Sequence, residues 1–462
     1  MNFKDQRAAW IIFLVALILR LLYIFPLSYP LSPDEATYIW GAKQILAGLF
    51  FPPTFERSDQ SPLYVLFLAA HFRLFGENFI FVRLTQAALG ALTAAMTYAL
   101  AKRITPQTSQ VSKNFGSLSG LIVALYPDLI VLNGLLLTET LYTFLLIALI
   151  LAWQIALDQS SLRWRALAGA LAGLTLLTRT SALVFIPLAF AWDIWNSRPT
   201  WRIGIQRALV SSAAMLIVLA PWLARNWGAY QTLFPPSYQT SYSLWASNHS
   251  GADGTMTALT PAMRAEEKQI QSLPAPERRA YLMNQALTWM REHPLDFVWL
   301  AIQKTARFIG VKPDGVFRGI FFGKYVEVIV PAFAKAMLWG LAIVGAIYSA
   351  QNWQRLGLIY SAILSGWAIT VVFAFAPRYL APFIPALAIL AANGLKPLGF
   401  PKPQRFVLDR RARVALILLC VFALNAGIDV ARNAGTIAAW QNFDTLSECD
   451  PAQSLIQCAP GK

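Results

Sequence analysis

The chain has 462 residues, of which 57% are hydrophobic and only 13% are charged, and its mean hydropathy is +0.50. A typical soluble domain has about 25% charged residues, so the composition excludes a string of soluble domains and indicates that lipid is the main solvent. The formal net charge is +15. Because the basic residues are not grouped with stacking aromatic residues, we assign this charge to membrane-protein loops and expect no nucleic-acid partner.

Apolar segments long enough to cross a bilayer, which takes roughly 17–25 residues, recur along the chain. They cover residues 8–27, 79–101, 116–134, 138–157, 166–178, 180–195, 204–224, 327–350, 356–376, 379–395 and 413–430. The first follows Lys4 and Arg7 and precedes no Ala-x-Ala cleavage site, so we interpret it as a retained span. The sequence therefore predicts an all-α polytopic membrane protein with about eleven transmembrane helices.

The loops between these segments alternate in charge. Lys and Arg gather in one set, including residues 396–413, whereas most carboxylates fall in the other set. The positive-inside rule then places the N-terminus in the cytoplasm and the C-terminus outside. A twelfth span over 295–311 would put the basic 396–413 loop outside, so we reject it. We expect four regions: a membrane module 1–224 with a first outer loop 28–78, an outer loop region 225–326, C-terminal spans 327–433 and an outer tail 434–462.

Both outer loops contain helix-like stretches. Residues 62–75 are too short to span comfortably and include His71 and Arg73, so we expect an interfacial helix there. The second loop is predicted to be mostly helical, with helices over 259–272 and 276–292 separated at Pro274.

Cysteine is scarce and no Cys-x-x-Cys motif occurs. Cys449 and Cys458 fall in the outer tail, where a disulfide and two free thiols are both open interpretations. Cys420 lies within an apolar span and is interpreted as a packing residue.

An acidic pair, Asp34 and Glu35, stands just beyond the outer end of the first span in "LSPDEATYIWGAKQI". Ser32, Pro33 and Glu35 match a helix capping box with proline at the first helical position, which requires no catalysis. Carboxylates beside a membrane are nevertheless functional candidates. The two interpretations are compatible, because a cap also fixes Asp34 rigidly at the start of a helix.

A second candidate is Glu139 in "YPDLIVLNGLLLTETLYTFLL", between the third and fourth predicted spans. Helix initiation and a buried hydrogen bond are the alternatives. A lone glutamate at this depth usually faces a water-filled cavity, so we favour a role in a site. Asp128 follows Tyr126 and Pro127 and is interpreted as an ordinary turn residue.

The order of these motifs resembles that of the GT-C glycosyltransferases, in particular the bacterial branch of the protein O-mannosyltransferase and aminoarabinose-transferase superfamily. The resemblance is carried by "SPDEATYIWGAKQI", "SPLYVLFLAAHFRLFGENFIFVRLTQAALGALT", "YPDLIVLNGLLLTETLYTFLL", "GALAGLTLLTRTSAL", "PWLARNWGAY" and "PRYLAPFIPALAIL". It is strongest over residues 1–230 and returns around 285–395.

This resemblance implies a catalytic base at Asp34, with Glu35 as its neighbour, and a second acidic position at Glu139. It also implies a polyprenyl-phosphate sugar donor and a reaction at the outer face of the membrane. A carboxylate can accept the proton of an attacking hydroxyl group. No metal site is predicted, because Asp34 and Glu35 are too few ligands, and no cofactor is firmly implied; dependence on a divalent metal is left open.

Cations would have to stabilise the leaving lipid phosphate. The outer-side candidates for binding donor phosphate are Arg225, Arg378, Lys304 and Arg307, and weaker ones are Arg57, Arg83 and Arg179. Taken singly, each could instead extend to lipid headgroups. Together, facing one cavity, they would form a phosphate clamp.

One stretch departs from the family pattern. Relatives often carry a Glu-Lys pair before the Pro-Pro that starts the next helix, whereas residues 59–64 read Asp-Gln-Ser-Pro-Leu-Tyr and lack the lysine. Tyr64 and Glu35 are candidates for positioning acceptor or donor. His249, in "TSYSLWASNHSGADGTM", is another such candidate, although a surface-loop histidine is the commoner case.

We therefore expect an inverting glycosyltransferase of the bacterial inner membrane, with its active site in the periplasm or outside the cell. Its partners would be a polyprenyl-phosphate sugar donor, membrane lipids, and an acceptor that is a glycolipid, a surface polysaccharide or a protein. A lipid-linked oligosaccharide flippase is an alternative, but it would show internal inverted repeats, which we do not find. An O-antigen-type polymerase or ligase is a third possibility, and it would depend on an outer-loop Arg and His.

Overall fold

A computed structural model describes residues 3–29, 31–50, 61–104, 114–198, 200–233, 237–256, 259–312, 324–395 and 410–439. Throughout these ranges the regular structure is helical, as predicted. The structure thus confirms the predicted all-α class. Cys449 and Cys458, for which a disulfide and free thiols were both open, lie outside the described residues, as do Arg57 and the Asp59–Gln60 stretch.

The predicted spans correspond to helices in chain order. They are α1 (Phe3–Ile24), α4 (Phe79–Ile104), α6 (Phe115–Leu125) with α7 (Pro127–Leu132), α8 (Thr138–Gln159), α9 (Leu162–Thr178), α10 (Ala182–Asn196), α11 (Trp201–Tyr230), α16 (Lys324–Tyr348), α17 (Gly357–Val372), the 3-10 helix η3 (Pro377–Phe383) with α18 (Ile384–Gly394), and α19 (Arg410–Ala439). Within the described residues, α1, α4, α8, α11, α16 and α19 are long and apolar enough to cross a membrane. The remaining crossings of the eleven-span topology stay a prediction.

One predicted span is broken. The segment 116–134 is divided between α6 and α7, because Pro127 forces Tyr126 into an extended conformation (φ −68°, ψ 120°). The chain then turns through residues 133–137 before α8 begins. This break leaves backbone groups at one end of the bundle, the end predicted to lie outside, and the side chains described below bind them.

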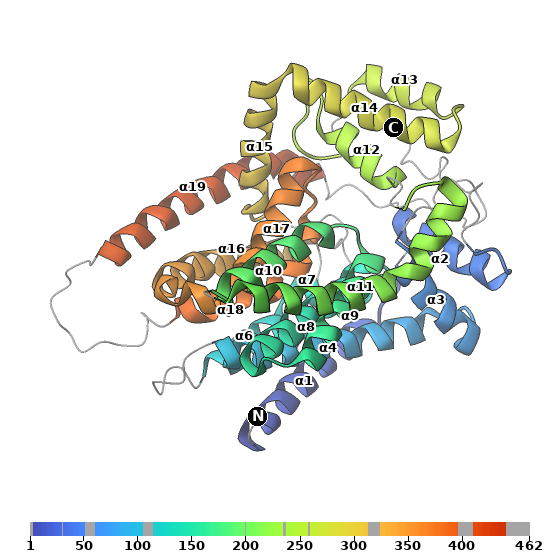
Figure 1. Ribbon diagram of the computed structural model, residues 1–462. Coiled ribbons are helices and arrows are strands. Elements are labelled where there is room, and N and C mark those ends of the chain that lie inside the picture. Colours follow the sequence, from blue (N-terminus) through green and yellow to red (C-terminus); the bar gives the residue numbers. More distant parts are fainter. Residues whose placement is uncertain are drawn as a thin grey trace.

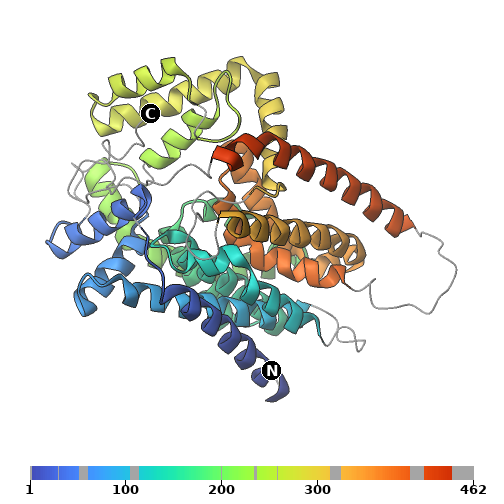
Figure 2. The same cartoon turned by 180° about the vertical axis from the view of Figure 1, so that it is seen from behind.

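The helices of the predicted outer segments include the expected ones after Ser32 and over 62–75, 259–272 and 276–292, and others that were not placed from the sequence. They are α2 (Pro33–Leu46), α3 (Pro62–Phe75), α12 (Tyr238–Ser247), α13 (Pro261–Ile270), α14 (Ala275–Glu292) and α15 (Pro294–Phe308). A short 3-10 helix, η2 (Ala350–Arg355), joins α16 to α17. Figure 1 shows α12, α13 and α14 as a layer on one side of the bundle, with the N-terminus of α1 at the opposite side, and Figure 2 shows the same arrangement from behind.

Helix α8 is the centre of the bundle: most of its side chains are buried, and it packs against α4, α9 and η3. By contrast, α1, α11 and α19 expose large apolar side chains such as Leu22, Ile217 and Leu424. An exposed apolar face of this length is stable when lipid covers it. The distribution fits a multi-pass membrane protein.

Helices α16 and α18 touch backbone to backbone. A Cβ atom on Gly345 would overlap the carbonyl of Leu390, and one on Gly394 would overlap the carbonyl of Leu341. Small residues allow this close approach between helices in a membrane. The contact fixes α18, and with it the preceding η3.

Candidate functional site

The first outer helix, α2, begins with the predicted capping box. The Ser32 side chain accepts a hydrogen bond from the Glu35 backbone amide, and the Glu35 carboxylate accepts one from the Ser32 amide. Pro33 occupies the first turn. Asp34 is therefore held in the first helical turn, where the helix dipole favours a negative charge. Its side chain keeps 44% of its surface exposed.

Glu35, in contrast, is fully buried and anchors α2 to the rest of the outer end. Besides the cap, its carboxylate accepts hydrogen bonds from the Tyr29 hydroxyl and from the Leu136 backbone amide, the latter at 2.9 Å. Leu136 lies in the turn before α8. Glu35 thus joins the first outer loop to the turn that leads into Glu139.

Glu139 lies in the first turn of α8 and is 3% exposed. Arg179, the C-cap of α9, approaches its carboxylate at 2.9 Å, measured from Nη1 to Oε1. The same Nη1 donates a hydrogen bond to the Thr138 hydroxyl at 3.1 Å. A small cavity lies against Glu139 on the bundle side and is also lined by Thr140 and Thr143.

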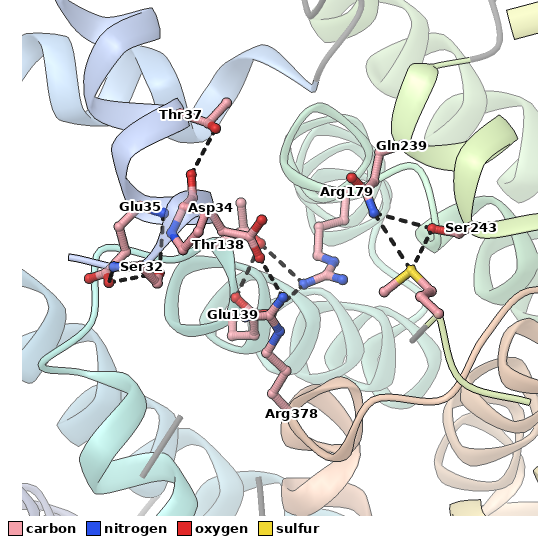
Figure 3. Close-up of polar contacts among 12 residues, drawn as sticks. Ser32, Asp34, Glu35, Thr37, Thr138, Glu139, Arg179, Gln239, Ser243 and Arg378 are labelled. Atoms are coloured by element: carbon pink, nitrogen blue, oxygen red, sulfur yellow. Dashed lines mark hydrogen bonds and ion pairs between the residues drawn. The ribbon is translucent and has the colours of Figure 1, made fainter. Parts of the chain in front are cut away.

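Arg378, in η3, connects the two acidic residues. Its Nη2 lies 2.5 Å from Asp34 Oδ2, and its Nε lies 3.7 Å from Glu139 Oε1. Figure 3 shows Arg378 and Arg179 pointing toward these carboxylates from different helices. The rings of Tyr142 and Tyr379 lie beside Arg179. We refer to Asp34, Glu139, Arg179 and Arg378 as the outer cluster.

The outer cluster unites residues that are distant in sequence. Asp34, Glu139 and Arg378 were candidates, and Arg179 was a weaker one. Arg179 could have ranked higher, because it interrupts the apolar pair of spans 166–178 and 180–195 and so had to find an anionic partner near the membrane.

Tyr64 and Glu35 have supporting positions. Tyr64 is fully buried, and its hydroxyl donates to Gln86 Oε1 at 2.9 Å. Gln86 in turn donates to the backbone carbonyls of Asn133 and Leu135. Tyr64 therefore contacts the outer cluster indirectly, through the turn before α8. Its predicted part in positioning acceptor or donor remains a prediction.

Lys304 and Arg307 lie on α15, in contact with other groups than the outer cluster. The Lys304 ammonium is fully buried and donates to Asn248, Val371 and Phe373. Arg307 Nη2 lies 2.9 Å from Asp253 Oδ2. Burial alone would raise the pKa of Asp253, but hydrogen bonds from Thr255 and the charge of Arg307 lower it overall. Lys304 thus binds the end of α17 and the residue after α12, and Arg307 binds the loop that follows α12.

Arg225 and His249 are also placed by local contacts. Arg225, on α11, lies against the rings of Trp222 and Tyr230, with its guanidinium carbon 4.9 and 5.0 Å from their centroids. The Nδ1 atom of His249 lies 2.9 Å from the Ser250 carbonyl oxygen. Donor binding by Arg225 and acceptor or donor positioning by His249 stay predictions.

Asp128 was interpreted as a turn residue, and the structure corrects this. It is 2% exposed and pairs with Lys335 of α16, with Nζ 3.2 Å from Oδ2. No local pattern predicts a contact between residues so far apart in the chain. Arg20 of α1 is likewise fully buried, and it donates to Asn133 and to carbonyls of Ala16 and Ala124.

No group of three or more His, Cys, Asp or Glu side chains that could hold a metal ion occurs in the part of the chain that the structure describes. The outer cluster instead combines two carboxylates with two guanidinium groups. Such a cluster can accept a proton on the exposed carboxylate and can bind an oxyanion through Arg378.

Comparison with solved structures identifies the fold. An archaeal oligosaccharyltransferase from Archaeoglobus fulgidus aligns over 97% of this chain and 59% of its own, with a TM-score of 0.53 and 12% sequence identity. The same enzyme in complex with an inhibitory peptide and a dolichol-phosphate aligns over 92% of this chain and 55% of its own, with a TM-score of 0.52 and 13% identity. The chain therefore shares the fold of this enzyme, and the expected GT-C-like fold is confirmed.

Sequence comparison adds a family model and individual proteins to which parts of this chain are similar. Residues 59–224 match the family model described as dolichyl-phosphate-mannose-protein mannosyltransferase. An undecaprenyl phosphate-alpha-4-amino-4-deoxy-L-arabinose arabinosyl transferase of Pseudomonas aeruginosa is 28% identical over 232 residues, which make up 47% of this chain and 40% of the relative. A protein of Aquifex aeolicus is 35% identical over 120 residues, 24% of this chain and 23% of the relative. The chain spans less than half the length of these curated relatives.

Proposed function

We propose that the protein is an inverting membrane glycosyltransferase that moves one sugar from a polyprenyl-phosphate donor to an acceptor at the outer face of the membrane. The convergence of Asp34, Glu139 and Arg378 carries this proposal. The family match over residues 59–224 and the arabinosyl transferase relative support the class of donor. A glycolipid, a surface polysaccharide and a protein all remain acceptor candidates.

Asp34 acts as the general base. It is the exposed carboxylate of the outer cluster and is fixed in the first turn of α2 by the capping box. In the reaction, Asp34 accepts the hydroxyl proton of the acceptor while the acceptor oxygen attacks the anomeric carbon. The bond from that carbon to the phosphate oxygen breaks on the opposite side, and its electron pair leaves with the polyprenyl phosphate. Attack opposite the leaving group inverts the configuration.

Arg378 binds the donor phosphate. Its guanidinium carries several donors, and one nitrogen already contacts Asp34 while another faces Glu139. A phosphate would compete with Asp34 for Arg378, because both are oxyanions. Donor binding thereby loosens the ion pair and leaves the Asp34 carboxylate free to accept a proton.

Glu139 serves a different purpose from Asp34, because it is buried and lies between two arginines. Before a donor phosphate binds, the negative charge of Glu139 holds Arg179 and Arg378 in place. We assign to it the orientation of these guanidinium groups rather than proton transfer. The active site would face the periplasm of a bacterial inner membrane, with the N-terminus in the cytoplasm.

The Asp34→Asn variant tests the catalytic assignment. Asparagine preserves the shape and suits a helix start, but it cannot accept the proton. We expect turnover of labelled polyprenyl-phosphate sugar to fall at least about a hundredfold, since general-base catalysis contributes roughly 10²–10⁴-fold. Undecaprenyl phosphate binding and the thermal midpoint should be retained.

Glu77→Gln is the matched control, because Glu77 is an exposed acid of the same outer region that pairs with Lys43 at 2.7 Å. It removes the same charge without touching the outer cluster and should leave transfer unchanged. Normal transfer by a folded Asp34→Asn protein would refute Asp34 as the base. If the unmodified protein consumed none of a panel of polyprenyl-phosphate sugars, the proposed reaction itself would be wrong.

A further inference from the structure

A buried lysine holds the segment that leads to Arg378. Helix α17 ends at Val372, and residues 373–376, which we call the strap, connect it to η3. The Lys304 Nζ donates to the carbonyl oxygens of Val371 at 3.2 Å and Phe373 at 2.7 Å. Its third hydrogen bond goes to Asn248 Oδ1 at 2.8 Å. All three ammonium hydrogens are therefore used.

These contacts cap the C-terminal end of α17. The last carbonyls of a helix lack internal partners and carry the negative end of the helix dipole, so a cation placed there is favourable. Asn248 extends the cap by donating to the Val372 carbonyl at 3.1 Å, and Ser247 donates to that of Phe373. The Phe375 amide donates to the Gly254 carbonyl at 3.1 Å. The strap thus lies against the end of α12 and its following loop.

The backbone around Lys304 leaves it little freedom. Gly254 has a φ of +86°, and a Cβ atom there would lie 2.7 Å from Lys304 Cγ. Only glycine fits this position readily, since other residues seldom adopt such a φ. The stem of Lys304 is therefore confined between Gly254 and the strap.

We propose that Lys304 is a positioning residue for Arg378: by binding the strap, its ammonium sets where η3 begins and so where the Arg378 guanidinium meets Asp34. This inference rests on the proposed function, in which Arg378 binds donor phosphate. The Lys304 ammonium binds Asn248, Val371 and Phe373 and not the outer cluster, so it would act on Arg378 through the strap.

The charge of Lys304 depends on pH in the neutral range. Burial lowers the pKa of Lys304 to about 7. Below that pH the ammonium caps α17, and above it the proton is lost and one of the three donors disappears. The charged side chains nearby are Asp253, Arg307 and Lys312. Asp253 and Arg307 pair with each other, and the charge of Lys312 also acts on Asp253. Asp253, with its lowered pKa, stays ionised through the neutral range.

The first test measures the strap itself. In Lys304→Met, amide hydrogen exchange over residues 373–379 should accelerate, while exchange in α8 stays slow. Thr305→Val is the matched control: Thr305 is the next residue of α15 and contacts Trp367 and Ala301, not the strap. Unchanged exchange over 373–379 in a folded Lys304→Met protein would overturn the proposal. This measurement needs no sugar transfer, so it is independent of the proposed function.

The second test separates positioning from general stability. Lys304→Arg keeps the charge and should rescue undecaprenyl phosphate binding and transfer, whereas Lys304→Met should lower transfer roughly a hundredfold, the scale of a misplacement of about 1 Å. If Lys304→Met does not fold, Gly254→Ala replaces it, because the added methyl group displaces the lysine without removing its charge.

The third test is the pH profile of transfer. The unmodified protein should lose activity as pH rises above about 7, the pH at which Lys304 gives up its proton. Lys304→Arg stays protonated and should lack this alkaline loss, and His249→Gln should retain it. An identical alkaline loss in Lys304→Arg would show that another group titrates and would overturn the pH dependence assigned to Lys304.

Discussion

Arg165 and Arg179 lie near opposite ends of helix α9, and the two side chains have opposite environments. Arg165, in its first turn, pairs with Asp193 of α10, and both side chains are completely buried; Trp153 donates to the same carboxylate at 3.1 Å. Arg179, just past its last turn, pairs with Glu139 and keeps 24% of its side chain exposed. Arg165 and Arg179 are 14 positions apart (179 − 165), which corresponds to about 21 Å along a helix.

Burial distinguishes the structural ion pair of Arg165 and Asp193 from the outer cluster, which a ligand can reach. The Arg165–Asp193 pair is sealed, so no ligand can replace either partner. The outer cluster has an extra guanidinium, that of Arg378, and an exposed carboxylate, that of Asp34. An oxyanion can enter there without opening the fold. The same residue types thus perform a structural task at one end of α9 and are available for chemistry at the other.

The largest effect is expected at the sealed pair. Asp193→Ala leaves a buried guanidinium without its carboxylate, and such a loss costs about 3–5 kcal/mol. The thermal midpoint should fall sharply, whereas undecaprenyl phosphate affinity per folded molecule should stay normal. Replacing both partners, as in Arg165→Met with Asp193→Leu, should recover most of the stability. If Asp193→Ala were as stable as the parent, the sealed pair would not be structural.

The next effect concerns Arg378. Arg378→Ala should weaken undecaprenyl phosphate binding by at least about tenfold, because a hydrogen bond to a charged group contributes roughly 1.5–3 kcal/mol. Its partner Asp34 is half-exposed and remains solvated, so the thermal midpoint should change little. Titration calorimetry and thermal melting on the same preparation separate the two outcomes. If Arg378→Ala were strongly destabilised but bound undecaprenyl phosphate normally, Arg378 would be a structural residue like Arg165 and not a phosphate ligand.

A smaller effect is expected from the cap that holds Asp34. Ser32→Ala removes the side-chain partner of the Glu35 amide and should cost about 1 kcal/mol of stability. Glu35 would keep its contact with Leu136, so α2 should remain in place. Transfer should therefore fall much less than in Asp34→Asn. An equal fall in both variants would mean that the cap, and not the Asp34 carboxylate, is what the reaction needs.

Local sequence pattern predicted the parts of the molecule that depend on near neighbours. Every predicted apolar segment contains a helix, although 116–134 is divided between α6 and α7. The helix placed at 62–75 is observed as Pro62–Phe75, and the Ser32–Glu35 capping box is confirmed. Each of these depends on residues within a turn or two of one another. Hydrophobic runs and caps report such relations directly.

Partners at long range were not predictable in the same way. The sequence ranked Lys304 as a phosphate ligand and Asp128 as a turn residue, and the structure gives both of them buried partners from other helices. A single sequence shows that a charge near the membrane needs a partner but not which one. The outer cluster was partly predictable, because the family resemblance indicated Asp34 and Glu139, whereas their joining through Arg378 depends on how η3 packs against α8.

Helices α16 and α18 are in close contact at Gly345 and Gly394. A substitution at this contact, far from the outer cluster, should displace Arg378. Gly345 faces the backbone of α18, which continues directly from η3 and Arg378. A single methyl group at that position would act as a wedge and push α18 outward. We therefore expect Gly345→Ala to weaken undecaprenyl phosphate binding by the folded protein, although Gly345 itself is remote from the outer cluster.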